Sequence, residues 1–425
     1  MVLLAIVLVL GVTGCAGRRV SQGPPVLAPA APIHPGRPLK VAIQLGAAEL
    51  AIQSPEPITL TVRGVTIGRF RSLGLTPAGR ELRIAPAGQE ARSLSDTLTL
   101  APAAGLMLEL NGKAYRGEIE TFVAADGGLV AVNGVDLEDY LVGVVPLEIG
   151  SPPTPSYAAV EAQAVAARTY AISHLGRWST FGFDLYGDER DQVYGGASVE
   201  TPLAARAVRE TQGVVATYGG ALIGAYYAAA CGGTSAAVEE TWAFPPAPYL
   251  EARPDRDQGP DFCRNSRHYR WQERWSARDL AATIRTHLSA EVPGAAPTGA
   301  LEDLAILTRN TSGRVKELRI RMGGQDYVVH GDRIRWVLRR PGGRILRSTS
   351  FDLTLERAQG ASAGPILTGI VVDGRGNGHG VGMCQAGALE MAAEGRDYPA
   401  ILGHYYPGIA LERLREPRLS QALDR

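Results

Sequence analysis

Short runs in which apolar and polar residues alternate dominate the early part of the chain. Leu39–Leu110 contains KVAIQL, ITLTVRG and GLMLEL, separated by Gly and Pro. Alternation with a period of two places the apolar side chains on one face of a strand, so this region is predicted to form a small antiparallel β-module. Strands and turns are expected to continue through Tyr115–Gly150, with turn signals at Gly127-Gly128 and Asn133-Gly134.

A helical pattern replaces this alternation after three prolines at positions 152, 153 and 155. Ser156 is a plausible N-cap for the helix that follows. Small apolar residues recur there at helical spacing, namely Val160, Ala164, Ala167 and Ala171. Gln163 and Arg168 flank this narrow stripe, so both are placed to point at the edge of a groove.

Later segments mix strands with helices. Helices are predicted from Thr201-Pro202, over Ala277–Leu288 and Asp332–Leu338, and at Gln385–Glu394, whereas 214–229 and much of 304–355 indicate strands. No internal repeat and no regular βαβ alternation is present. The expected fold class is therefore α+β, with mixed and largely antiparallel sheets, several helices around a groove and the small N-terminal β-module.

Shifts in composition divide the chain into segments. Residues 1–15 form an apolar leader, 16–38 a Pro/Ala-rich tether, 39–112 the β-module and 113–412 the main domain, with a loop- and strand-rich insertion at about 255–365. Residues 413–425 form a C-terminal tail. The leader ends in VTGC and resembles a bacterial lipobox, although no Lys or Arg precedes its apolar run. We therefore expect lipidation at Cys15 and an extracytoplasmic, membrane-anchored lipoprotein.

Charge and cysteine content narrow the possible partners and the compartment. The formal net charge is +0, so no feature favours nucleic acid as a partner. Apart from Cys15, three cysteines remain, and an odd number in an oxidising compartment permits one disulfide and one free thiol. Cys231 and Cys263 flank a loop-rich segment and form the favoured pair, with pairing of Cys384 to either as the alternative.

Two segments carry the candidate chemistry. In Tyr140–Ala171 a single carboxylate, Glu148, is expected between an apolar strand and the Ala-rich helix. Apolar surroundings raise the pKa of a carboxyl group, and a carboxyl that keeps its proton can act as a general acid. The alternative is a capping or salt-bridged glutamate. The second segment, Gly374–Gly387, has too many glycines for the core of a strand or helix and contains His379 and Gln385.

These segments belong to a collinear series of motifs that resembles the SpoIID/LytB family. The matching pieces are YRGEIE (115–120), VNGVDLEDYLVGVVPLE (132–148), EAQAVAARTYA (161–171), QVYGG (192–196), AYYAAACGGTSA (225–236), PYLEARPD (248–255), RSTSF (347–351), the 374–387 run and HYYPGIAL (404–411). The sporulation member of that family is a lytic transglycosylase of cell-wall glycan. The resemblance implies a catalytic domain that binds peptidoglycan glycan strands, with Glu148 as general acid and base.

The resemblance also implies substrate contacts, each with a structural alternative. Candidate substrate-binding residues are Gln163, Arg168, Gln192, Tyr194, Tyr226, Tyr227, His379 and Gln385. Arg168 can instead pair with Glu161 on its own helix, and Tyr226 and Tyr227 can instead pack in the core. His379 can instead hold the glycine run in place by hydrogen bonds.

No cofactor or metal is implied. Some SpoIID-type proteins hold a metal through His and Cys residues just before the QVY segment, but Asp184–Asp191 contains neither. A set of Cys231, Cys263 and His268 matches no standard zinc spacing. The resemblance leaves a second function open, that of a non-catalytic peptidoglycan-binding protein that modifies a wall amidase, and a third, an envelope scaffold with a closed groove.

Overall fold

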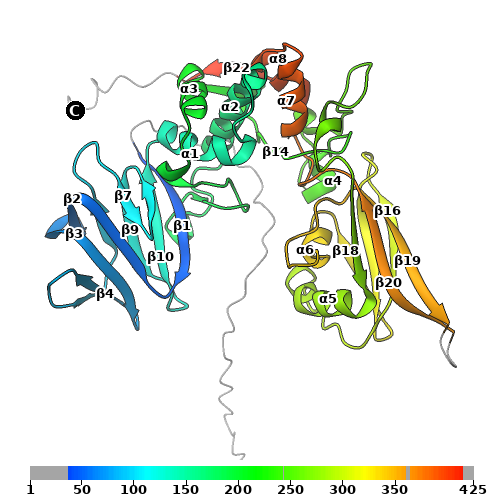
Figure 1. The fold of residues 1–425 in the computed structure, drawn as a ribbon, viewed down its shortest axis with the longest axis horizontal. Helices are drawn as coiled ribbons and strands as arrows, with labels where there is room; N and C mark the ends of the chain where they lie inside the picture. The colour runs from blue at the N-terminus through cyan, green and yellow to red at the C-terminus, as the bar shows by residue number, and fades with distance from the viewer. Residues whose placement is uncertain (1–36, 243, 360–363, 415–425) are drawn as a thin grey trace, which may run out of the picture.

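The computed structural model describes residues 37–242, 244–359 and 364–414. Figure 1 shows a β-rich part at one end, a group of helices in the middle and a second lobe of strands and helices at the other end. This mixture confirms the α+β class. The predicted leader, Cys15, nearly all of the tether and residues 415–425 of the tail lie outside the described residues. Within the described residues, no helix has the length and apolar character that a bilayer crossing requires.

The N-terminal part forms an eleven-stranded sheet within the described chain, in the order β11-β1-β10-β9-β6-β2-β3-β4-β5, with β7 paired to β2 and β8 paired to β7. Its strands are β1 (Leu39–Ala47), β2 (Leu50–Val62), β3 (Val65–Ala78), β4 (Glu81–Pro86), β5 (Arg92–Leu94), β6 (Leu98–Ala101), β7 (Leu108–Leu110), β8 (Lys113–Tyr115), β9 (Glu118–Val123), β10 (Leu129–Val135) and β11 (Leu185–Tyr186). The pairs are antiparallel except β1 with β11. Gly127-Gly128 forms the predicted turn, whereas the turn predicted at Asn133-Gly134 is wrong because both residues lie in β10.

The apolar segment before Glu148 is a helix, α1 (Leu137–Ile149), so the predicted strand is wrong. The side chain of Asp136 accepts a hydrogen bond from the backbone N–H of Glu138 and caps the helix. Its buried residues follow a helical repeat, at Tyr140, Leu141, Val144 and Val145. Glu148 therefore lies in the last turn of α1 rather than at a strand–helix junction.

The helix α2 (Tyr157–Ser173) lies at the centre of the helical part. Every residue from Ala159 to Ile172 except Glu161 is buried. The predicted stripe of small residues is thus one side of a helix that is covered almost all round. Around it pack α1, α3 (Pro202–Glu210), α7 (Gln385–Ala393) and α8 (Tyr398–Tyr405).

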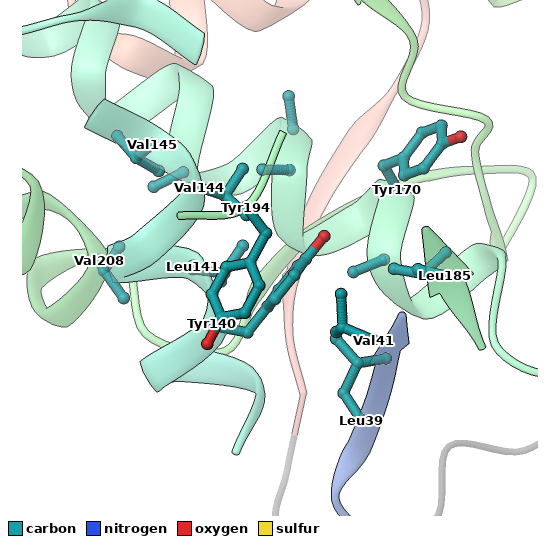
Figure 2. Close-up of a cluster of buried hydrophobic side chains, with 14 of the residues drawn as sticks. Leu39, Val41, Tyr140, Leu141, Val144, Val145, Tyr170, Leu185, Tyr194 and Val208 are labelled. Atoms are coloured by element: carbon teal, nitrogen blue, oxygen red, sulfur yellow. The ribbon is translucent and has the colours of Figure 1, made fainter. Parts of the chain in front are cut away.

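Tyrosine rings join the helices to the N-terminal sheet. Figure 2 shows Tyr140 and Tyr194 beside each other between α1 and Leu39 and Val41 of β1. Their ring centroids are 4.9 Å apart. This continuous apolar packing fixes α1 on the sheet and thereby fixes the position of its C-terminal turn.

The second lobe has its own hydrophobic core, which includes Ile284, Leu318, Ile320 and Val372. Its elements are β15 (Trp271–Ser276), α5 (Ala277–Glu291), β16 (Leu301–Arg309), β17 (Val315–Met322), β18 (Gln325–His330), α6 (Arg333–Val337), β19 (Phe351–Gln359) and β20 (Pro365–Gly374). The helices predicted here and at the C-terminal end are confirmed within a few residues. The remaining elements are β12 (Val214–Tyr218), β13 (Ala221–Leu222), β14 (Tyr227–Ala228), α4 (Val238–Trp242), β21 (Met383–Cys384) and β22 (Ala410–Arg413).

The glycine run returns the chain from the second lobe to the helices. It leads into β21, which pairs in parallel with β14. Gly382 has a φ of +72°, and a Cβ at this position would lie 2.0 Å from the backbone oxygen of Tyr226. Only glycine permits this close approach, which places Gln385 at the start of α7 against the central helices.

Candidate functional site

Glu148 is partly buried where α1 meets the start of α7. Its Oε1 accepts a hydrogen bond from the backbone N–H of Val193 at 3.0 Å, and its Oε2 accepts one from Nε2 of Gln385 at 3.4 Å. Among the described residues, no Lys, Arg or His forms an ion pair with it. The carboxyl group therefore has two hydrogen-bond donors but no compensating positive charge.

Burial raises the pKa of Glu148 to about 7. The two hydrogen bonds act in the opposite direction, and the nearby Glu189 carboxylate raises the pKa further. Near neutral pH this carboxyl is consequently present in both protonation states. A group of this kind can donate a proton and take one back within one reaction cycle.

Two glutamine side chains join Glu148 into a hydrogen-bonded group. Nε2 of Gln385 also donates to Oε1 of Gln163 at 3.1 Å. Gln163 lies on α2 and is fully buried, and its Nε2 has no hydrogen-bond partner among the described residues. Three helices, α1, α2 and α7, thus bring together residues from distant parts of the sequence, and the candidates Gln163 and Gln385 lie beside Glu148. With no exposed surface, Gln163 does not point at a groove edge, which corrects that part of the prediction.

Gln192 supports the loop that donates to Glu148. It is fully buried, its Oε1 accepts from the Tyr140 hydroxyl at 3.1 Å, and its Nε2 donates to the Tyr227 hydroxyl at 2.7 Å. The next residue, Val193, supplies the backbone N–H to Glu148. Burial and the nearby Glu148 carboxylate hold the pKa of Tyr227 well above its usual value. Gln192 therefore helps to hold the loop whose Val193 N–H contacts Glu148, and the Tyr227 hydroxyl that it binds lies near that carboxylate.

Tyr194 and Tyr226 lie in the core. Only 7% of Tyr194 and 6% of Tyr226 is exposed. The hydroxyl of Tyr194 donates to Oδ1 of Asn133, and the ring of Tyr226 packs on Trp242 with centroids 4.9 Å apart. The structure thus places Tyr226 in core packing, the alternative left open for it, and places Tyr194 in the core rather than on the sugar-facing surface that was expected.

Arg168 is fully buried and forms an ion pair with Glu138, not with Glu161. Its Nε and Nη2 donate to the two carboxylate oxygens of Glu138 at 2.8 and 2.7 Å. The backbone oxygens of Val208 and Val214 and Oγ1 of Thr211 accept its other hydrogen bonds. With no exposed surface, Arg168 does not reach a groove edge, which corrects its expected substrate contact. It instead fixes α2 to the first turn of α1.

His379 lies in the glycine run between β20 and β21. Its Nδ1 accepts a hydrogen bond from the backbone N–H of Val381 at 3.1 Å, and its ring packs on Trp242 at 4.7 Å. Burial lowers its pKa to about 4, so the ring is neutral at pH 7. These contacts agree with the alternative in which His379 holds the glycine run in place. Among the described residues, it forms no hydrogen bond with Glu148.

The three cysteines of the described chain are buried free thiols, so the favoured disulfide between Cys231 and Cys263 is not formed in this structure. Their two sulfur atoms lie 3.7 Å apart. Cys384 and Asp255 lie beside them, and one ligand atom from each of the four residues lies within 4.8 Å of all the others. His268 is elsewhere, with Nδ1 3.0 Å from Nη1 of Arg347.

Several residues around these sites were not identified from the sequence. The backbone N–H of Val193 carries no side-chain signal, and Tyr140 was assigned to a strand. Glu138 accepts hydrogen bonds from Arg168, which lies 30 residues later in the sequence, and Asp255 accepts one from the backbone N–H of Cys263, which lies 8 residues later. Periodicity along one segment cannot reveal such pairs; Glu138 was nevertheless detectable as an acid in the first turn of a capped helix.

Sequence comparisons match two regions of the chain. Residues 125–218 match the SpoIID family, described as Stage II sporulation protein. This region contains α1 and α2 and therefore Glu148. Residues 258–382 match a family described as a domain of unknown function (DUF8618), which corresponds largely to the second lobe.

Three relatives cover most of the chain. An uncharacterized protein of Brachyspira hyodysenteriae is 31% identical over 304 residues, which cover 71% of this chain and 73% of that protein. The amidase enhancer of Bacillus subtilis is 29% identical over 294 residues, 64% of this chain but only 40% of that protein. The stage II sporulation protein D of Bacillus subtilis is 26% identical over 296 residues, 65% of this chain and 75% of that protein.

Proposed function

This chain belongs to the SpoIID/LytB family, and from that premise we propose that it is a lytic transglycosylase that cleaves the glycan strands of bacterial peptidoglycan. The observation that carries the proposal is Glu148, a partly buried carboxyl that forms no ion pair with any described residue and has a pKa of about 7. A general acid that works near neutral pH needs a raised pKa of this kind.

A single carboxyl group is sufficient for this reaction. Protonated Glu148 donates its proton to the glycosidic oxygen as the bond from that oxygen to C1 of the muramyl residue breaks. The C6 hydroxyl of the same sugar forms the new bond to C1, and its proton passes to the Glu148 carboxylate. No water molecule attacks, so the second carboxylate that a hydrolytic glycosidase requires is not needed.

The neighbours of Glu148 hold it in position for both proton transfers. The Val193 N–H and the Gln385 amide bind the two carboxylate oxygens from different elements and fix the plane of the carboxylate. Because both donate hydrogen bonds, they also stabilise the ionised form after the proton has left. The Tyr227 hydroxyl, held by Gln192, adds a polar group next to this carboxylate.

The proposal is tested on purified glycan strands, both intact and stripped of stem peptides. The wild-type chain is expected to release anhydro-muramyl ends, detected by mass spectrometry, and Glu148→Gln to release none. Glu394→Gln, at an exposed position just after α7, is the matched control and should act as the wild type does. Full activity of Glu148→Gln would contradict the proposed mechanism.

A second candidate function is supported by the 29% identity to the amidase enhancer of Bacillus subtilis. In this case the protein binds glycan without cleaving it and stimulates a wall amidase. The two functions separate in one experiment in which the chain is added to peptidoglycan with and without a purified amidase. Anhydro-muramyl ends without amidase support the transglycosylase, whereas faster release of stem peptides with no such ends supports the enhancer.

The location of the protein is part of the same proposal. A glycan substrate lies outside the cytoplasmic membrane, and the lipobox-like VTGC segment supplies a lipid attachment site at Cys15. Metabolic labelling with radioactive palmitate is expected to label the wild-type chain and not Cys15→Ser. Equal labelling of both chains would contradict the anchor.

A further inference from the structure

We propose that Cys231, Asp255, Cys263 and Cys384 form a structural zinc site. Zinc in closed structural sites takes four ligands in a tetrahedron, and thiolates and carboxylate oxygens are both among the ligands that it binds. All four residues are buried, so the site has no open position for a substrate. Among the described residues, the hydrogen bonds of Glu148 come from Val193 and Gln385 and not from these four, and the proposal does not rest on the proposed activity.

The spacing of the ligand atoms fits a tetrahedral ion. A Zn–S bond of about 2.3 Å places two sulfur ligands of a tetrahedron roughly 3.8 Å apart. The sulfur atoms of Cys231 and Cys263 are separated by 3.7 Å. With all four ligand atoms within 4.8 Å of one another, small side-chain rotations complete the tetrahedron.

Hydrogen bonds to the candidate ligands hold them in this arrangement. The Tyr405 hydroxyl donates to Oδ1 of Asp255 at 2.7 Å, and the backbone N–H of Cys263 donates to its Oδ2 at 2.9 Å. The backbone N–H of Cys231 donates to the sulfur of Cys384 at 3.2 Å. Such outer contacts orient the ligands of metal sites and are part of their construction.

A buried cation next to the cluster gives separate support for a bound metal ion. Only 1% of Arg314 is exposed, and its Nε and Nη1 have no hydrogen-bond partner among the described residues. Its Nη2 donates to the backbone oxygen of Cys231 at 2.7 Å. A buried guanidinium is costly unless negative charge compensates it. Three thiolates and one carboxylate around a divalent ion carry net negative charge, and this charge would stabilise Arg314.

Zinc binding would connect three separate parts of the chain near the candidate active site. Cys231 follows β14, Asp255 and Cys263 belong to the segment before β15, with Cys263 in a short 3-10 helix (Phe262–Asn265), and Cys384 directly precedes Gln385 at the start of α7. The ion would fix the N-terminal end of α7 and thus the amide that contacts Glu148. Binding replaces the thiol protons with the metal and involves no oxidation or reduction.

The zinc content of the full chain, purified under reducing conditions and dialysed against metal-free buffer, tests the proposal. We expect about one zinc per chain by elemental mass spectrometry. After replacement of zinc by Co²⁺, thiolate-to-metal charge-transfer bands and the intense visible bands of a tetrahedral cobalt site should appear. Both measurements use the wild-type chain, so they decide the proposal even where a ligand variant fails to fold.

Variants assign the site to these residues. Cys384→Ser and Asp255→Asn should lose the metal, and Tyr405→Phe should weaken its affinity roughly 10–100-fold by removing one outer hydrogen bond. The controls Cys15→Ser and His268→Ala should keep the full zinc content. A wild-type chain without zinc or cobalt bands would overturn the proposal. So would a disulfide between Cys231 and Cys263, or metal that persists in both ligand variants.

Discussion

Each end of α1 carries a glutamate, and the two glutamates differ in whether a cation pairs with them. Glu138 in the first turn pairs through both carboxylate oxygens with the buried Arg168. Glu148 in the last turn has only neutral hydrogen-bond donors, from Val193 and Gln385. Both residues are partly buried glutamates of the same helix, so burial alone does not distinguish them.

The difference lies in how the charge is compensated. An ion pair with a cation compensates the charge of an acid and joins two elements, as Glu138 does by holding α2 against α1. An acid that is buried without a cation holds its proton to a higher pH, as Glu148 does with a pKa of about 7. The comparison supports a structural role for Glu138 and the proposed acid–base role for Glu148, and the same Glu→Gln substitution tests both.

The largest expected effect is the loss of glycan cleavage in Glu148→Gln. Removing a general acid typically lowers a rate 10²–10⁴-fold, and Gln is close to Glu in size but cannot transfer the proton. The rate of formation of anhydro-muramyl ends at pH 6 measures this loss. A decrease of less than about tenfold would remove Glu148 from the mechanism.

The next effect in size is the destabilisation expected in Glu138→Gln. This variant leaves the Arg168 guanidinium buried without its anion, which should lower the free energy of unfolding by about 3 kcal/mol. Urea denaturation followed by circular dichroism measures the change. The double variant Glu138→Gln/Arg168→Met should recover part of the stability because it also removes the buried charge. If Glu138→Gln were as stable as the wild type, the structural role given to Glu138 would be wrong.

Glu148→Gln should change stability in the opposite direction and only above pH 5. The pKa of Glu148 is 4.5 in the unfolded chain and about 7 in the folded protein. The folded protein therefore binds an additional proton between these values, and the wild type loses stability as the pH rises through this window. At pH 8 we expect Glu148→Gln to exceed the wild type by roughly 1–3 kcal/mol, with no difference at pH 4. If the free energies of unfolding of the two proteins changed with pH in the same way, the claim that the charge of Glu148 is uncompensated would be contradicted.

The smallest expected effect concerns Gln385, whose amide lowers the pKa of Glu148. Gln385→Ala should raise this pKa by roughly half a unit and move the alkaline limb of the activity profile to higher pH. Gln212→Ala, at an exposed position, is the control and should leave the limb in place. A limb that moves to lower pH in Gln385→Ala would show that the amide acts through another group.

The sequence predicted the elements whose signals are local. The Thr201-Pro202 start of α3, the amphipathic helix α5 and the helix after the glycine run were all found because caps and periodicity lie within each segment. The α1 segment was misassigned because VGVVP is rich in valine, which favours strands. The signal for a helix is the N-cap Asp136, which lies several residues before VGVVP.

The candidate site was predictable only in part, for a related reason. Glu148, Gln163 and Gln385 were identified as separate candidates, but their contact depends on packing of α1, α2 and α7. Arg168 was misplaced because an ion pair on one helix is visible in a sequence and a pair between two helices is not. The thiol–carboxylate group likewise forms only when Cys384 meets a segment that lies more than a hundred residues before it.

The pKa of Glu148 itself is the most direct test of the central claim that this acid lacks a compensating cation. Infrared difference spectra between the wild type and Glu148→Gln, recorded across a pH titration, isolate the C=O stretch of this one protonated carboxyl. The account predicts that the band disappears with a midpoint at about pH 7. A midpoint at pH 4.5, the ordinary value for a glutamate, would contradict it.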